Sequence, residues 1–131
     1  MIHHIDMQHK FPVMELAVKS GSTVTDGELV KLTSGTLEKA TTGATTFFGV
    51  ALKGAASEEN ASVLVFDAIP TIEADWTGTA PTVGDACSID STAKKFTTAS
   101  GSGNGLVLKY DSVSGRATVM LKSGVLVATK N

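Results

Sequence analysis

Short apolar runs, separated by Gly, Thr and Ser, recur along most of the chain, and several of them alternate between apolar and polar residues. This two-residue period, bounded by turn-forming residues, is typical of β-strands. No amphipathic helix of useful length is found in the pattern. Two segments near the ends of the chain, VMELAV (13–18) and GVLVAT (124–129), alternate well enough to be predicted as strands.

Part of this pattern occurs twice. The stretch GVALKGAASEENASVLVF (49–66) returns as GLVLKYDSVSGRATVMLK (105–122), and with a one-residue change of offset DGELVKLTSGTLEKAT (26–41) matches VGDACSIDSTAKKFTT (83–98). The match is consistent in pattern and low in identity, so chance similarity between segments rich in Val, Gly and Thr is the alternative. We interpret it as a duplicated unit.

Each repeat, spanning about residues 26–66 and 83–122, is predicted to contain four short strands. One copy alone leaves VALKGAASEEN ambiguous between a helix and a hairpin, but its partner LVLKYDSVSGRA carries β-branched residues and a Ser-Gly turn. Both copies therefore read as strand, turn, strand. The predicted strands are 28–32, 37–41, 48–53 and 61–66 in the first copy, and 85–89, 95–98, 106–110 and 117–122 in the second.

The fold class that follows is all-β. A chain of 131 residues fits one domain of ordinary size. Closing a β-sheet into a barrel removes its unpaired edge strands. A sheet of four strands also needs a second layer to bury its apolar face. We expect a single small antiparallel β-barrel or sandwich, built from two related four-strand units, over residues 13–131. A flexible N-terminal arm is expected over 1–12. Whether the units form one barrel or two packed sheets stays open.

Composition and charge exclude several classes of protein. The chain is 42% hydrophobic and 18% charged, so it is not intrinsically disordered. Its net charge of −2, with no basic run beyond Lys94 and Lys95, disfavours binding to nucleic acid or an anionic membrane. The opening lacks the apolar core of a secretory signal and no run reaches bilayer-spanning length, so synthesis in a cytoplasm is expected.

The chain offers little for catalysis or metal binding. The histidines, His3, His4 and His9, all lie in the first nine residues, where metal binding or pH sensing competes with a mobile solvated terminus, and their spacing favours the latter. No histidine follows to act as a general base. The densest carboxylates form no recognisable acid/base pair: Glu58, Glu59, Asp67, Glu73 and Asp75. We predict a protein that is not an enzyme and binds no cofactor or metal.

The single cysteine, Cys87, has no partner for an internal disulfide or a zinc site. The repeat aligns it with Val30, so we expect a small buried strand residue rather than a nucleophile.

Two segments are candidates for contact with a partner. The only tryptophan, Trp76, lies in the segment 67–85, which is predicted to connect the repeats, between Pro70 and Pro81. It either caps the barrel or contributes to a partner surface, and both alternatives stay open. The N-terminal arm, which leads into FPVMEL (11–16), could add a strand to a neighbouring sheet edge. The candidate contact residues are His3, His4, His9, Phe11 and Trp76.

The pattern VTDGELVKLTSGTLEKATTGATTFFGVAL, followed by VGDACSID, GLVLK and RATVML, resembles small all-β structural proteins of tailed-phage heads. The shared features are a G-(D/E)-x-V turn into a strand, a later G-(V/L)-(A/V) strand and a closing V-x-(V/L) strand, over residues 18–122. The resemblance implies a decoration, or cement, protein on the exterior of the capsid. By analogy with lambda-type head decoration proteins, it implies trimers bound to the major capsid protein, with an N-terminal segment that orders against the shell.

An alternative from a different class is a carbohydrate- or receptor-binding β-module of a phage fibre or spike. Such modules use aromatic platforms, and the chain offers Trp76 and Tyr110 as its large amphipathic rings. An enzyme of unknown type is the third alternative, and it would require a pocket with perturbed acids.

Overall fold

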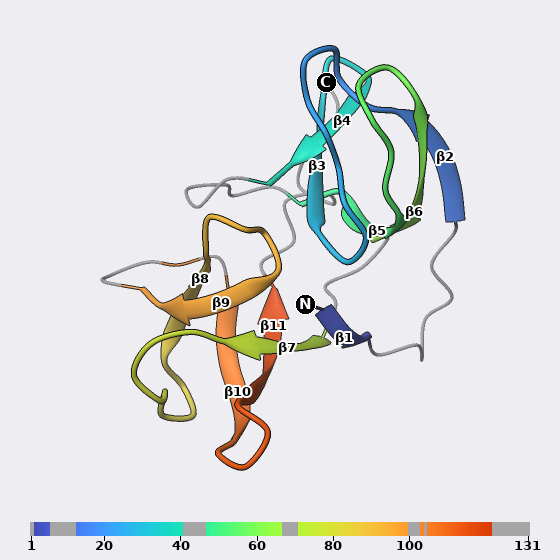
Figure 1. The fold of residues 1–131 in the computed structure, drawn as a ribbon. Helices are drawn as coiled ribbons and strands as arrows, with labels where there is room; N and C mark the ends of the chain where they lie inside the picture. The colour runs from blue at the N-terminus through green and yellow to red at the C-terminus, as the bar shows by residue number, and fades with distance from the viewer. Residues whose placement is uncertain are drawn as a thin grey trace.

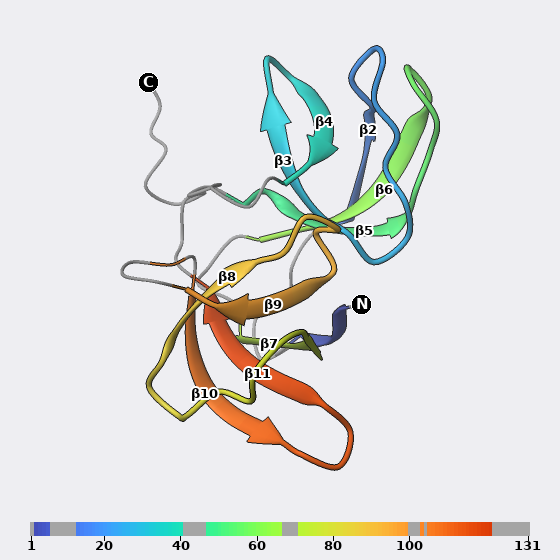
Figure 2. The same ribbon diagram turned by 60° about the vertical axis from the view of Figure 1, so that its left-hand side comes forward.

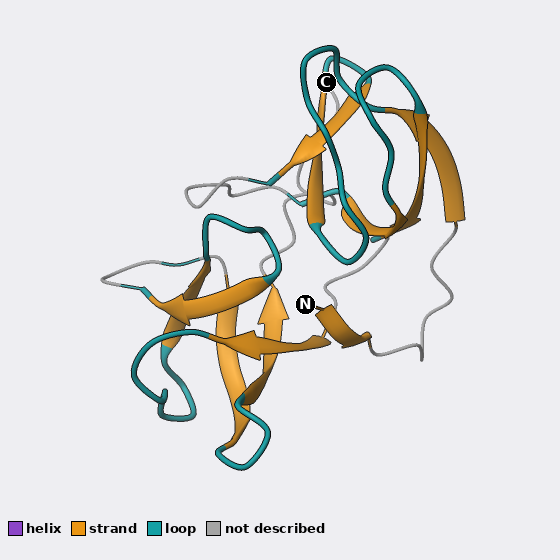
Figure 3. Ribbon diagram, viewed as in Figure 1, coloured by secondary structure: helices purple, strands orange, loops and turns teal. Residues whose placement is uncertain are grey.

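The computed structural model describes residues 2–5, 13–40, 47–66, 71–99, 103 and 105–121, with the backbone alone for 2–5. Over these residues the chain forms β-strands and no helix, which confirms the predicted all-β class (Figures 1 and 3). The strands are β1 (Ile2–Ile5), β2 (Val13–Ala17), β3 (Leu29–Thr33), β4 (Thr36–Lys39), β5 (Gly49–Lys53), β6 (Asn60–Val65), β7 (Thr71–Trp76), β8 (Ala86–Ile89), β9 (Lys95–Thr98), β10 (Gly105–Asp111) and β11 (Arg116–Leu121).

The strands form two units with the same topology (Figures 1 and 2). The first unit is a sheet in the order β2-β6-β5-β3-β4, and the second repeats it as β7-β11-β10-β8-β9. Parallel pairing of β7 with β9 closes the second sheet into a five-stranded barrel. A single parallel bridge between Val18 and Leu37 joins the corresponding edges of the first. β1 also pairs with β7, at Ile72–Ala74, beside the residues of β7 that pair with β9.

The eight strands predicted within the repeats are present close to their expected bounds, and VMELAV forms β2. Each unit has five strands: β2 is the fifth strand of the first unit, and Thr71–Trp76, predicted to belong to the connecting segment, is β7, the fifth strand of the second. That assignment was wrong, since Ile72 and Ala74 point into the core and Glu73 points outward, as in any half-buried strand. The predicted strand at 124–129 lies outside the described residues.

The structure also gives the arrangement of the two units and of the first residues. No strand pairing links the two sheets within the described residues, so the units form two separate sheets that pack together, one of the alternatives that the sequence left open. Within the segment 1–12, which was expected to be a flexible arm, Ile2–Ile5 pair with β7 in antiparallel orientation. The other residues of that arm lie outside the described part of the chain.

The same turn starts β3 and β8, and it explains the repeated G-(D/E) pattern. In the turns at residues 25–28 and 82–85 the third residue is a glycine with positive φ, 82° at Gly27 and 96° at Gly84. In both turns the carboxylate of the fourth residue accepts a hydrogen bond from the first residue's N–H at 2.9 Å. In both turns the backbone N–H of the fourth residue donates to the backbone carbonyl of the first residue. An acidic residue after glycine therefore fixes the entry into the strand.

The two units share part of their hydrophobic core. One cluster lies inside the first unit and includes Val30, Leu37 and Val63. The second cluster fills the second unit and also contains residues from the first unit: Leu29, Ala40, Phe47, Val50 and Phe66. The Leu29 N–H also donates to the Ala93 carbonyl at 2.8 Å. The units are thus joined by apolar packing of an outer face of the first against the second.

Candidate contact surface

The described residues contain no cluster of candidate metal ligands. Among them, no three His, Cys, Asp or Glu side chains are placed to hold a metal ion. Glu73 and Asp75, two of the carboxylates singled out in the sequence, instead form ion pairs with Arg116 on the neighbouring strand β11, at 4.0 and 3.7 Å. Their role in this arrangement is cross-strand pairing on an exposed face.

Cys87 is fully buried in β8, as expected from its alignment with Val30. Burial raises the pKa of its thiol to about 12, because the thiolate would lose its hydration. The nucleophilic thiolate is therefore suppressed at neutral pH.

Trp76, at the end of β7, makes its contacts within its own unit. The indole Nε1–H donates to the Thr79 carbonyl at 2.9 Å, which ties the following loop to the barrel. The ring meets Tyr110 edge-on, with 6.5 Å between centroids and 69° between planes, and both rings pack against the core of the second unit. Of the two alternatives, these contacts support a cap on the barrel.

The other candidate contact residues belong to the N-terminal segment. His3 and His4 lie in β1, where His4 is in register with Glu73 of β7. Since Ile2 is in register with Ala74, β1 lies along the strand that ends at Trp76 (Figure 1). His9 and Phe11 lie outside the described residues. The structure therefore brings β1 and Trp76 to the same unit.

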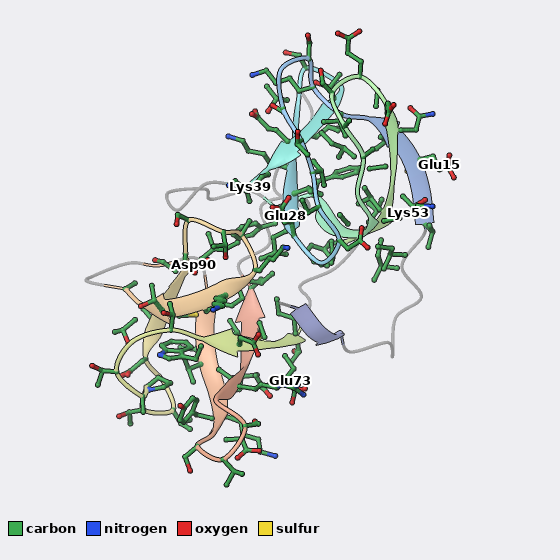
Figure 4. The ribbon with its side chains drawn as sticks, viewed as in Figure 1. Glu15, Glu28, Lys39, Lys53, Glu73 and Asp90 are labelled. Carbon is green, nitrogen blue, oxygen red and sulfur yellow. The ribbon has the colours of Figure 1, made fainter. Side chains whose placement is uncertain are left out.

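Between the two units lies an open depression, lined from both sides by polar residues. Figure 4 shows Glu28 and Lys39 on the side of the first unit that faces the second. The lining residues are Glu28, Lys39, Ser91, Thr92, Lys94 and Lys95. The Glu28 carboxylate accepts the Thr25 N–H within its turn. The Lys94 and Lys95 pair noted in the sequence therefore lies at the junction of the units.

Equivalent apolar residues on the outer faces of the two units differ in how exposed they are, and the sequence did not reveal this difference. In the first unit, Leu29, Val50 and Leu64 lie side by side on three adjacent strands, and we call them the first-unit row. Their equivalents in the second unit are Ala86, Leu106 and Met120, the second-unit row. The sequence alignment showed apolar residues in both copies, but not which copy is covered.

Coverage of the two rows differs sharply. The first-unit row is buried, with Val50 4% and Leu64 7% exposed, whereas Leu106 and Met120 of the second-unit row are each 38% exposed. Exposed apolar side chains that lie directly opposite each other on adjacent strands are a feature of contact surfaces. The second-unit row is thus a candidate contact surface of the described residues.

A family model of phage cement proteins matches residues 7–129, which is nearly the whole chain. The chain belongs to the phage cement protein family. This phage cement protein therefore has a structural, capsid-associated role and is a component of the virion, as the resemblance implied. No curated protein matches the chain. The described residues include no helix long and apolar enough to cross a membrane.

Proposed function

We propose that the chain binds the outer surface of a phage capsid and stabilises it there, without catalysis and without a cofactor. The observation that carries this proposal is the family match over residues 7–129. The structure supports the proposal, because the two β-units share an apolar cluster, Asp75 is paired with Arg116 and the Cys87 thiol is buried. A cement protein needs a rigid body and contact surfaces rather than reactive groups.

The proposed partner is the major capsid protein, with neither nucleic acid nor membrane involved. The chain is made in the host cytoplasm and joins the exterior of the virion. We propose a homo-oligomer, a trimer at the three-fold positions of the shell. Several weak contacts made by one symmetric assembly then add through a high effective concentration, so that clamping is stronger than any single contact.

The proposed capsid contacts are the N-terminal segment, with His3, His4, His9 and Phe11, and the loop that follows Trp76. Their common location supports this choice: β1 pairs along β7, and Trp76 ends that strand. An N-terminal segment that leaves β7 and orders against the shell would offer backbone N–H and C=O groups for added strand pairing. The second unit would then face the capsid.

The test uses capsids from a phage from which this protein has been removed. Purified protein is mixed with these shells, and co-sedimentation and the temperature of capsid disruption are measured for wild type, for a chain lacking residues 1–10 and for Trp76→Ala. We expect wild type to bind and to raise the disruption temperature, and both changes to weaken binding at least tenfold. Val113→Asp, at a position that is 95% exposed in the β10–β11 turn, is the control.

The outcomes separate the parts of the proposal. Wild type that neither binds nor stabilises the shells contradicts the function itself. Full binding by the chain lacking residues 1–10 contradicts only the role of the N-terminal segment, and full binding by Trp76→Ala contradicts only the role of that loop. Circular dichroism of each variant shows whether the fold is retained.

A further inference from the structure

The outer edges of the equivalent strands β2 and β7 differ between the two units. In the second unit, Ile2–Ile5 of β1 pair with β7 at Ile72–Ala74 in antiparallel orientation. Among the described strands, β2 pairs only with β6, so its other side has no partner strand between Val13 and Leu16. We call this side of Val13–Leu16 the open edge. Figure 1 shows β2 at the outside of its unit, whereas β1 lies beside β7.

Backbone hydrogen bonds show which groups point to the open edge. On this side of β2 the Lys19 N–H donates to the carbonyl of Leu37 in β4 at 2.8 Å, and the equivalent Thr77 N–H donates to β9 at 2.9 Å. Alternate residues of a strand direct their N–H and C=O groups to the same side. Glu15 therefore presents both groups to the open edge, just as its equivalent Glu73 presents them to β1.

The side chains along the open edge are exposed. Val13 is 57% and Met14 44% exposed, whereas Ile72, the equivalent of Met14, is fully buried. Proteins commonly protect an edge strand with lysine, proline or a β-bulge. Val13–Leu16 contain neither residue, and their pairing with β6 continues without a bulge. The open edge therefore has the features of a strand that can accept another strand.

The charge at the centre of the open edge indicates which strand would fit. In the second unit Glu73 forms an ion pair with Arg116 at 4.0 Å. In the first unit Asn60 takes the place of Arg116, as the first residue of the equivalent strand β6. The exposed Glu15 carboxylate accepts only the Ser62 hydroxyl, at 3.5 Å, and forms no ion pair within the described part of the chain. A basic residue directly opposite Glu15 would complete a cross-strand pair.

We infer that the open edge binds an extended segment of the major capsid protein as an added antiparallel strand. This segment carries a basic residue opposite Glu15, between apolar residues opposite Met14 and Leu16. Backbone hydrogen bonds supply affinity in such a contact, and the opposed side chains supply selectivity. The strand comes from another protein because β1, the segment that fills the equivalent edge, is already paired with β7 of its own chain.

This inference rests on the proposed function and adds to it a contact in the first unit. Strand addition requires one extended arm of the capsid protein and no flat surface, so it is compatible with a second unit that faces the shell.

The test compares two substitutions of Glu15 in co-sedimentation with shells that lack this protein. Glu15→Pro removes the outward N–H and leaves the groups that bond β6, and proline is tolerated on an edge strand where its nitrogen faces solvent. Glu15→Thr keeps the N–H and removes only the charge. We expect Glu15→Pro to weaken binding roughly tenfold or more, and Glu15→Thr roughly two- to fivefold. Val113→Asp is expected to bind as wild type does.

Amide hydrogen exchange, measured by mass spectrometry, then locates the added strand on the wild-type protein. The Glu15 amide faces water in the free chain and is expected to exchange rapidly. On the shells its exchange is expected to slow roughly tenfold or more, because it then donates to the added strand. The Met14 amide is the internal control, since it is already directed to β6 and is expected to change less.

The outcomes separate this inference from the proposed function. Wild type that does not bind the shells contradicts the proposed function, and the inference with it. Wild type that binds while Glu15→Pro binds equally well, with the Glu15 amide unprotected, overturns the inference alone. Protection of that amide without shells, rising with protein concentration, identifies a second copy as the occupant and also overturns it. If Glu15→Pro alters the circular dichroism spectrum, Val13→Pro, at the first residue of β2, replaces it in the comparison.

Discussion

At the scale of single residues, the two units place different side chains, Cys87 and Val30, at the same buried position. Cys87 in β8 and Val30 in β3 occupy equivalent positions, and each is in register with the glycine that begins the next strand of its sheet. Both side chains are fully buried. A small apolar group is needed there, and a neutral thiol meets that need as valine does.

This burial predicts a loss of stability at alkaline pH. The thiol pKa is about 12 in the folded chain and about 8.5 in an unfolded one, so only the unfolded state loses the proton between these values. The contribution of this group is complete below about pH 8.5 and falls as pH rises above it. At pH 9.5 the free energy of unfolding is expected to be lower by about 1.4 kcal/mol.

Urea unfolding at pH 7.5 and 9.5 measures this effect, with Cys87→Ala as the control that lacks the thiol. Cys87→Ala is less stable overall because it leaves a small cavity, but its loss between the two pH values is expected to be smaller than that of wild type. Equal losses in the two proteins would show that Cys87 is not the titrating group.

At the scale of the strands, most of the fold could be predicted, because the alternation within each repeat is physical and local. β7 could not, although Ile72 and Ala74 alternate with Glu73 and Asp75. Its counterpart β2 lies upstream of the aligned region, so comparison of the repeats gave no support for a strand there. Pro70 and the single tryptophan favoured a connecting segment, and the pairing with Arg116 that stabilises the outer face is non-local.

The candidate surface was harder to predict for the same reason. Alignment of Val50 with Leu106 shows that both are apolar, but exposure depends on which unit packs against which face. The turn at residues 90–94 contacts the first unit through Ala93, which accepts the N–H of Leu29, and the sequence of a row does not encode this neighbour. The sequence therefore points only to isolated aromatic and histidine residues as candidate contacts.

The first residues of β5 and β10 carry an element-scale prediction. A Cβ at Gly49 would lie 2.1 Å from the carbonyl oxygen of Leu64 on the neighbouring strand, and at Gly105 it would lie 2.7 Å from a methyl group of Val119 and 2.9 Å from the carbonyl oxygen of Met120. A side chain can rotate away more easily than a strand backbone can shift, and the overlap with a backbone carbonyl is much larger at Gly49. Gly49→Ala is expected to lower the free energy of unfolding by about 1–3 kcal/mol, and Gly105→Ala by less.

Urea denaturation of the two variants beside wild type gives both values, and each glycine is the matched control for the other. A Gly105→Ala protein as destabilised as Gly49→Ala would mean that neither Val119 nor the Met120 carbonyl can move aside.

At the scale of the whole molecule, the shared core implies that the two units unfold together. Five residues of the first unit belong to the apolar cluster that fills the second, so separating the units exposes part of that cluster. The chain has one tryptophan, Trp76, and it packs against the core of the second unit. Its fluorescence therefore follows the second unit alone, while far-UV circular dichroism follows both.

The repeat provides a matched pair of substitutions for testing this coupling. Val50→Asp places a carboxylate in the junction between the units, and burying this charge without water is expected to lower the free energy of unfolding by several kcal/mol. Leu106→Asp makes the change to aspartate at the equivalent but exposed position. In wild type and Leu106→Asp the two signals are expected to change at the same urea concentration. In Val50→Asp the dichroism is expected to fall in two steps, the first preceding the tryptophan signal. Coincident signals in Val50→Asp would mean that contacts other than the first-unit row hold the units together.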